Sequence, residues 1–382
     1  MNMKIYLVGG AVRDKLLGLT VKDRDWVVVG ATPEELTAKG YRPVGKDFPV
    51  FLHPETQEEY ALARTERKSG HGYTGFVFHT SPDVTLEDDL IRRDLTINAM
   101  AEDEQGSIID PYNGQSDLNN RILRHVSTAF EEDPLRILRV ARFAARFHAQ
   151  GFSIAPETMQ LMKKMVASGE ANYLVPERVW QETVRALKEK SPAVYFTTLM
   201  ACGALKAVMP EWHNILEENA SAFSALQMAT TANESERVRF SCLFPPSNSA
   251  HSCERLQAFF KTMRFPLQFT ERALLVNTHL SEFIDIQTRI NSEQLIALFE
   301  KTDAFRRPER FIDALSGSYY LAKTKGKELD ATNKKIVAQL LKQCCSIDAK
   351  PIVAQGYQGK EIGKQLRSLR IKKVNCLINQ KN

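Results

Sequence analysis

Short apolar runs alternate with amphipathic stretches over the first 125 residues. Runs rich in β-branched and aromatic residues predict strands, and apolar positions spaced three and four apart predict helices. Strands are expected at 4–8, 26–30, 50–53, 59–64 and 107–110, and helices at 11–18, 33–40 and 88–101. This part of the chain therefore predicts an α+β fold, in which helices accompany a small mixed or antiparallel sheet.

Helical periodicity takes over from about residue 130. Helices are expected at 134–147, 156–169, 176–189 and 192–205, each with a proline in its first turn, and helical patterns continue at 292–305 and 333–345. The segment 244–252 is rich in Pro and Ser and predicts a loop. We expect a head over 1–125, an all-α neck over 126–210, a helical body over 211–320 and a basic helical tail over 321–382.

The composition is typical of a soluble globular protein. Of the 382 residues, 43% are hydrophobic and 25% are charged, and no apolar run approaches the roughly 20 residues of a transmembrane helix. The first residues, MNMKIYLVGG, lack the apolar segment and cleavage site of a signal peptide. The six cysteines form no C-x-x-C pair, so we expect reduced thiols in a cytoplasm rather than a zinc site or a disulfide framework.

Positive charge is concentrated at the C-terminal end. The net charge is +5, which is compatible with a nucleic-acid partner without requiring one. Residues 360–382 contain seven Lys and Arg and a single acid, Glu361. Such a run is usually a solvated tail, so it indicates a polyanion-binding surface only if other residues point to one.

Two carboxylates, Asp23 and Asp25, lead into the strand expected at 26–30. Side chains two apart on a strand lie on the same face, so the pair presents negative oxygens together at one strand end. Such a pair suits divalent metal ions, and two ions about 3.5–4 Å apart are the usual clamp for nucleotidyl transfer. Alone, the D-x-D pattern is weak, because most such pairs are solvated turn residues.

A glycine pair stands between the first strand and the first helix. Gly9 and Gly10 let backbone N–H groups approach a phosphate, although a plain tight turn would need them too. Arg13 follows in the first turn of the helix, where the helix dipole mildly disfavours a cation. A cation at that position indicates a phosphate ligand.

Five motifs in order resemble those of a known family. They are GGAVRDKLLG (9–18) with KDRD (22–25), RRDLTINAMA (92–101), DPYNGQSDL (110–118), EDPLRILRVARF (132–143) and PERVWQE (176–182). They resemble the class II nucleotidyltransferases of the polymerase β superfamily, the group of tRNA CCA-adding enzymes and bacterial poly(A) polymerases. The resemblance covers residues 3–210 and is closest to the gammaproteobacterial type of tRNA nucleotidyltransferase.

The resemblance assigns roles to residues of the head and neck. It implies that Asp23 and Asp25 are catalytic and hold Mg²⁺, with Glu59 as a possible third carboxylate, although Glu58 or neither would also fit. It implies that the nucleotide is bound by Gly10, Arg13, Arg93, Arg139 and Arg142, with Asp94 and Asn98, as i,i+4 neighbours on a helix, on its sugar side. It also implies that 64–76 is the flexible loop that participates in the switch from CTP to ATP.

The base-selecting residues implied by the resemblance are Asp133 and Arg136. Cytosine and adenine both carry an exocyclic amine beside an unprotonated ring nitrogen, so Asp133 can accept from the amine and Arg136 can donate to the nitrogen. Guanine and uracil present the reverse order and would leave these groups unpaired, which discriminates by up to about 10⁴–10⁵. The common alternative is that Arg136, Arg139 and Arg142 are simply a row of arginines that face the solvent.

The motif PERVWQE predicts a structural helix rather than chemistry. Pro176 opens the helix, Glu177 complements its dipole, and Arg178 and Glu182 are i,i+4 partners that could pair on its surface. Longer relatives of this type carry an HD phosphohydrolase domain after the neck. Residues 215–290 contain only His251 and His279 and no His-Asp pair, so we expect no phosphohydrolase metal site.

Three functions remain open from the sequence. The first is a CCA-adding tRNA nucleotidyltransferase that uses CTP and ATP and contacts the acceptor arm and 3′ end of tRNA. The second is a poly(A) polymerase or an enzyme that adds only CC or only A. The third is a non-enzymatic RNA-binding protein, which would have no need of the carboxylates Asp23 and Asp25 as metal ligands.

Overall fold

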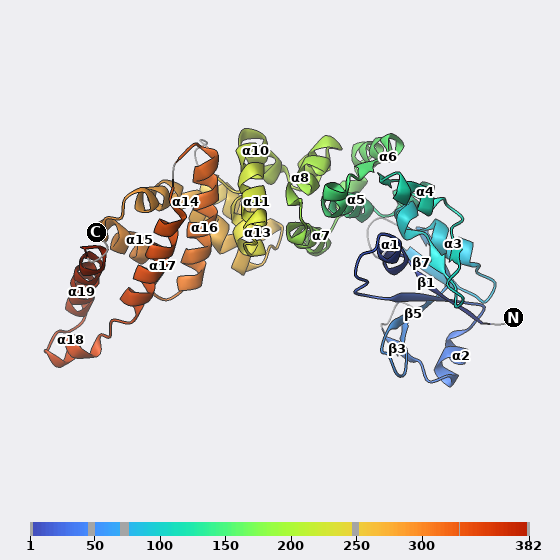
Figure 1. Cartoon of the computed structure of the whole chain (residues 1–382), viewed down its shortest axis with the longest axis horizontal. Coiled ribbons are helices and arrows are strands. Elements are labelled where there is room, and N and C mark those ends of the chain that lie inside the picture. The colour runs from blue at the N-terminus through green and yellow to red at the C-terminus, as the bar shows by residue number, and fades with distance from the viewer. Residues whose placement is uncertain (1–2, 45–49, 69–75, 247–251, 328, 380–382) are drawn as a thin grey trace. The chain divides into compact units, whose positions relative to one another are not determined.

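The chain divides into two compact units, Met1–Val208 and Met209–Asn382. The structure is a computed structural model, and it describes residues 3–44, 50–68, 76–246, 252–327 and 329–379. Figure 1 colours the first unit from blue to green and the second from yellow to red. The first unit contains all the described strands, and the second is helical.

A seven-stranded sheet forms the centre of the head. Its strand order is β3-β4-β5-β2-β1-β8-β9. The strands are β1 Lys4–Val8, β2 Asp25–Val29, β3 Arg42–Val44, β4 Val50–Leu52, β5 Glu59–Leu62, β8 Ala101–Glu102 and β9 Ile108–Ile109. All neighbours are antiparallel except β2 and β5, which are parallel. The predicted α+β head with a small mixed sheet is therefore confirmed (Figure 1).

Successive valines of β2 serve opposite faces of the sheet, as strand periodicity requires. Val27 packs with Leu90 of α3 (Leu86–Ile91) in one buried cluster, and Val28 packs with Leu36 of α2 (Pro33–Ala38) in another. A separate hairpin pairs β6 (Arg64–Lys68) with β7 (Phe76–Thr80). The expected flexible loop at 64–76 falls largely on residues 69–75, which lie outside the described residues.

The helix predicted over 88–101 is wrong. Helix α3 ends at Ile91, and Thr96–Asn98 form only a short 3-10 helix, η2. The backbone N–H groups of Leu95 and Thr96 donate to the Asp94 side chain and to Arg124 O, at 2.9 Å each. Because a continuing helix would send these donors to carbonyls four residues back, the aspartate and the tertiary bond end it.

The neck is built of helices around α5 (Leu135–Phe147). Helix α5 packs against α7 (Pro176–Lys188) and α8 (Pro192–Ala201). Helices α6 (Pro156–Ala167), α7 and α8 each have proline in the first turn, as predicted. The helix predicted over 192–205 is divided at Gly203, whose φ of +82° allows the chain to turn before α9 (Ala204–Val208).

The second unit is all-α over its described residues. Its helices are α10 Pro210–Glu218, α11 Ser221–Thr231, α12 Glu236–Ser241, α13 Ser252–Thr262, α14 Leu267–Thr288, α15 Ser292–Lys301, α16 Pro308–Thr324, α17 Ala331–Cys345, α18 Lys350–Ala354 and α19 Lys360–Asn379. Most of the loop predicted at 244–252 lies outside the described residues. Within the described ranges, no helix is long and apolar enough to cross a membrane.

Candidate active site

A cavity of about 840 Å³ opens in the first unit and is lined by all nine residues that the sequence nominates for the site. They are Gly10, Arg13, Asp23, Asp25, Arg93, Asp133, Arg136, Arg139 and Arg142. Among the described lining residues, eleven Lys and Arg face six Asp and Glu. The cavity therefore combines a net cationic wall with two free carboxylates at a strand end.

Asp23 and Asp25 lie exposed at the start of β2. Strand β2 begins at Asp25, so strand periodicity does not extend to Asp23, and the cavity is what brings the two together. Within the described part of the chain, neither carboxylate accepts a hydrogen bond, and neither forms an ion pair. The surrounding cavity walls shield Asp25 from part of the solvent and raise its pKa, nearby Arg93 lowers this pKa, and Asp23 raises it further.

Glu59 is the register partner of Asp25, because β2 and β5 run parallel. Directly paired residues of neighbouring strands point to the same face, and Glu59 also lines the cavity. The Glu58 carboxylate is engaged elsewhere, because its Oε2 accepts a hydrogen bond from Trp26 Nε1 at 2.9 Å. Among the described residues, no three His, Cys, Asp or Glu side chains are grouped as metal ligands, so a third ligand remains a prediction.

Gly9 combines a left-handed backbone conformation with a close approach of Arg93. Gly9 has φ +70°, and a Cβ there would lie 2.8 Å from Arg93 Nη1. Arg93 in turn donates to Asp89 Oδ2 at 3.0 Å. Asp89 has no exposed side-chain surface, also pairs with Arg92, and keeps a lowered pKa because Arg93 and Arg92 outweigh the effect of burial. Asp89 thus holds Arg92 and Arg93 together, a contact that the sequence did not reveal.

Arg13 is buried, with 3% of its surface exposed, and its guanidinium has protein partners. Nε and Nη2 donate to Asp14 Oδ1 at 2.9 and 2.8 Å, and Nη1 donates to Asn98 Oδ1. The guanidinium also lies 5.2 and 5.1 Å from the ring centroids of Phe143 and Phe147. In this conformation Arg13 acts on the cavity through Asn98 rather than by presenting a free charge.

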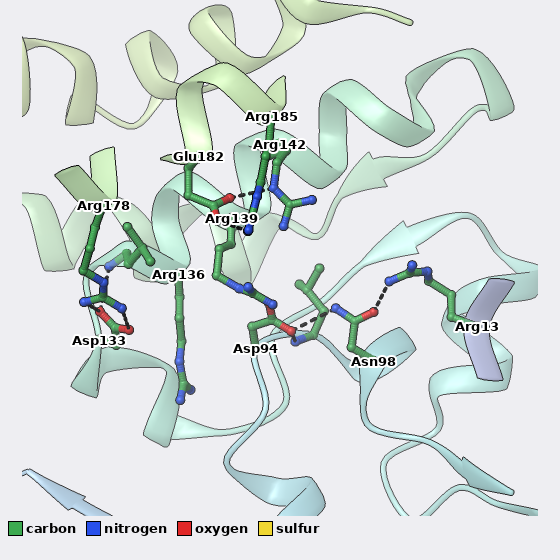
Figure 2. A network of polar contacts seen from close by, with 12 residues as sticks. Arg13, Asp94, Asn98, Asp133, Arg136, Arg139, Arg142, Arg178, Glu182 and Arg185 are labelled. Carbon is green, nitrogen blue, oxygen red and sulfur yellow. Dashed lines mark hydrogen bonds and ion pairs between the residues drawn. The ribbon is translucent and has the colours of Figure 1, made fainter. Parts of the chain in front are cut away.

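The contacts of Arg13 belong to a network that starts and ends on α5. Asn98 donates to Asp94 Oδ1 at 2.9 Å, and Arg139 Nε lies 2.7 Å from Asp94 Oδ2, as Figure 2 shows. At the other end, Arg146 Nη2 lies 2.9 Å from Asp14 Oδ2. Burial opposes ionisation of Asp94, but Arg139 and Asn98 hold its pKa well below the usual range.

The base-selecting candidates Asp133 and Arg136 both have protein partners. Arg136 Nη1 donates to Ala129 O at 3.0 Å. Asp133 forms a two-pronged ion pair with Arg178 of α7, with Nη1–Oδ1 at 3.3 Å and Nη2–Oδ2 at 2.8 Å (Figure 2). Two-pronged pairs of this kind fix the plane of a carboxylate as well as its charge. Arg178 also lines the cavity.

The predicted surface pair between Arg178 and Glu182 is therefore wrong. Arg178 reaches Asp133, while Glu182, which is 2% exposed, accepts from Arg142 Nε at 2.6 Å and from Arg185 at 3.4 Å. Helices α5 and α7 pack together, so each acid is neutralised by a partner on or near the facing helix. Spacing within one helix cannot reveal such a pair, and Arg178 was missed for that reason.

A nucleotidyltransferase is the class of protein that this fold and cavity define. Family models agree: residues 5–124 match the "Poly A polymerase head domain", and residues 151–216 match the "Probable RNA and SrmB- binding site of polymerase A". A CCA-adding enzyme of Pseudomonas putida (strain W619) is 50% identical over 374 residues, covering 98% of each chain. A CCA-adding enzyme of Coxiella burnetii (strain RSA 493 / Nine Mile phase I) is 47% identical over 381 residues, covering 99% of this chain and 96% of the other.

The chain belongs to the CCA-adding enzymes, the tRNA nucleotidyltransferases that form the 3′-terminal CCA sequence of tRNA. Relatives of this similarity favour full CCA addition over the poly(A) or partial alternatives, and enzymes of this family use divalent metal. The fold agrees with the Bacillus stearothermophilus CCA-adding enzyme in complex with CTP, with a TM-score of 0.70 and 23% identity, covering 98% of this chain and 89% of that one. The Thermotoga maritima CCA-adding enzyme complexed with tRNA_CCA has a TM-score of 0.67 and 22% identity. The match covers 98% of this chain and 88% of that one.

The expected lack of a phosphohydrolase metal site stays a prediction. His279 Nδ1 contacts Glu282 Oε2 on α14, and this pair accounts for its polar contact. His251 lies outside the described residues.

Proposed function

We propose that Asp23 and Asp25 carry the CCA addition by holding Mg²⁺ in the head cavity, with CTP and ATP as substrates. The single observation that supports this most is the cavity itself: among the described residues it gathers eleven cationic side chains and two carboxylates without a hydrogen-bond partner. A triphosphate needs both, because its charge must be balanced while its phosphorus is attacked.

The carboxylates fit a hard divalent cation. Their oxygens are exposed and have no hydrogen-bond partner in the described part of the chain, and Mg²⁺ prefers one or two carboxylates together with substrate phosphates. When bound, the metal supplies a lowered pKa for the RNA 3′-hydroxyl and charge neutralisation at the departing pyrophosphate. Glu59, beside Asp25 in the sheet register, is the candidate for a further ligand.

Arginines of the cavity divide between direct and indirect roles. The Arg139 side chain is 36% exposed and Arg93 is 19% exposed, so both can donate to phosphate oxygens. Arg13 and Arg142 are 3% and 9% exposed and are paired with Asp14 and Glu182. We assign these two to nucleotide binding through the groups they hold, with Gly10 leaving backbone room beside Arg13.

Asp133 and Arg136 select the base in this proposal. Asp133 accepts from the exocyclic amine of cytosine or adenine, and Arg136 donates to the adjacent ring nitrogen. Arg178 holds the Asp133 carboxylate in a fixed orientation through two contacts, which supports its role as an acceptor. The carboxylates Asp23 and Asp25 are then indifferent to the base, and the choice of nucleotide lies on α5.

The polynucleotide partner is the acceptor arm and 3′ end of tRNA, and the compartment we propose is the cytoplasm. The Thermotoga relative is described in complex with tRNA_CCA and the Bacillus relative with CTP. Helix α19 carries most of the basic C-terminal run, and its lysines and arginines are suited to phosphate contacts. Binding through such contacts weakens steeply with salt.

One incubation tests the proposal. Purified protein is mixed with tRNA lacking its last three nucleotides, Mg²⁺, and CTP, ATP or both. Growth by three nucleotides that requires both triphosphates is the expected result. An A-tail would indicate a poly(A) polymerase, growth by only CC or A a partial enzyme, and no growth with tRNA still bound a binding protein.

A further inference from the structure

A second pocket, of about 700 Å³, lies within the second unit between α11, α16 and α17. It falls within the roughly 300–1,000 Å³ typical of small-molecule and cofactor sites. Its residues have no part in the nucleotidyl transfer assigned to the first unit.

Apolar groups form the walls of this pocket. Met228 and Ala232 contribute from the end of α11, and Tyr319 and Tyr320 from α16. The two tyrosine rings meet edge to face, with centroids 5.2 Å apart and planes at 82°. Tyr320 donates its hydroxyl proton to Glu234 at 2.9 Å, which fixes the orientation of its ring. Both rings are largely buried, with 7% of Tyr319 and 6% of Tyr320 exposed, so only a small part of each ring faces the pocket.

Three lysines surround the aromatic wall. Lys334 Nζ lies 5.4 Å from both tyrosine centroids and pairs with Glu234 at 2.9 Å, so its charge is compensated. Lys323 Nζ lies 5.6 Å from the Tyr319 centroid. Lys323 and Lys335 are exposed, and neither has an acidic partner among the residues that the structure describes. Two uncompensated cations thus stand at the mouth of an apolar cavity.

This combination selects a ligand with a planar apolar part and an anionic part. An unstacked nucleotide has both, since its base can lie against aromatic and methyl groups while its phosphate lies at the rim. The polyanion that a CCA-adding enzyme must hold is tRNA, whose loops contain unstacked bases. We propose that this pocket binds one unstacked nucleotide of the tRNA, with the base beside Tyr319 and Met228 and the phosphate between Lys323 and Lys335. The inference rests on tRNA being the substrate proposed above.

A variant that fills the pocket distinguishes binding of a nucleotide in the pocket from general electrostatic attraction of tRNA. Ala232 is exposed and lies in the turn directly after α11, so Ala232→Trp should occupy the cavity without changing charge. Ala354→Trp, at another exposed alanine outside the pocket, is the matched control. Equilibrium binding of tRNA lacking CCA should weaken by about fivefold or more for Ala232→Trp, the effect of losing one base contact, and stay within twofold for the control. The KM for tRNA should rise while kcat is kept.

Charge reversal provides the second pair of variants. Lys323→Glu with Lys335→Glu should weaken tRNA binding more than Lys325→Glu with Lys342→Glu, which makes the same change at exposed positions outside the pocket. Equal effects of the two pairs, or an Ala232→Trp variant that binds as tightly as its control, would overturn the inference.

A free nucleotide is the other source of the same chemistry. Saturation of wild-type protein with CMP or AMP that Ala232→Trp abolishes, without any change in tRNA affinity, would assign the pocket to a free nucleotide and overturn the tRNA role. Failure of the wild type to bind tRNA at all would instead overturn the proposed function, and this inference with it.

Discussion

Arg178 of α7 holds Asp133 at the start of α5, with Nη2 and Oδ2 2.8 Å apart. The two residues are 45 positions apart in the chain and lie on different helices of the neck. If Asp133 reads the base, its orientation depends on a residue of a neighbouring helix.

Removing Arg178 should therefore change the choice of nucleotide. In Arg178→Ala, Asp133 loses its two-pronged partner, so we expect incorporation of UTP or GTP relative to CTP or ATP to rise by at least about tenfold. Arg178→Lys should recover only part of the selectivity, because an ammonium lacks the fork of donors. Lys188→Ala, at the exposed end of the same helix, is the control. Unchanged selectivity in Arg178→Ala would show that the pair is structural only.

Asp133→Ala tests the reading of the base directly. It removes the acceptor for the exocyclic amine, so we expect selectivity to fall more than triphosphate affinity. The measurement is kcat/KM for each of the four nucleotides on tRNA that lacks its CCA end. A variant that loses affinity for CTP and ATP but still rejects UTP and GTP would defeat the template assignment.

Much of this architecture could be predicted, because it follows from local patterns. The strand of Val27 and Val28, the proline-initiated helices and the grouping of nine site residues all correspond to motifs read in order. Errors arose where tertiary contacts decide. The Asp94 side chain accepts from Leu95 N and so helps to end the helix that was predicted over 88–101. The spacing of apolar residues carries no sign of this contact. Arg178 and Glu182 have ideal spacing to pair with each other, yet packing of α5 on α7 gives each a different partner.

The buried carboxylate of Asp89 gives a prediction for pH. Its pKa is lowered in the folded protein because Arg93 and Arg92 outweigh burial. A lowered pKa contributes stability that is fully present above the unfolded value of about 3.9 and is lost as pH falls from there through the lower folded pKa. Asp89→Asn should thus destabilise the first unit by about 3–5 kcal/mol at pH 7, and the difference from wild type should shrink below about pH 4.

Hydrogen exchange of β1 and β2 amides during urea unfolding reports on the first unit alone, so it separates this effect from the helical unit. The control is Glu87→Gln, which changes an exposed carboxylate of the same helix. A difference between wild type and Asp89→Asn that stayed constant from pH 7 to pH 3 would contradict the assignment.

Asp14 and Arg146 should act as one unit. Their ion pair, 2.9 Å long, closes the network that runs from α5 through Arg13, and both side chains are partly shielded from solvent. We expect Asp14→Ala and Arg146→Ala each to slow CTP addition, and the double variant to be little worse than either single one. Additive effects in that double-mutant cycle would show that the two residues act separately.

The most direct measurement compares nucleotide addition with tRNA binding in Asp23→Ala. The central claim is that Asp23 and Asp25 perform chemistry that is indifferent to the base, while nucleotide choice lies on α5. With truncated tRNA, Mg²⁺, CTP and ATP, we expect no CMP or AMP addition by Asp23→Ala, together with tRNA affinity within about twofold of wild type. Turnover retained with either nucleotide would contradict the claim.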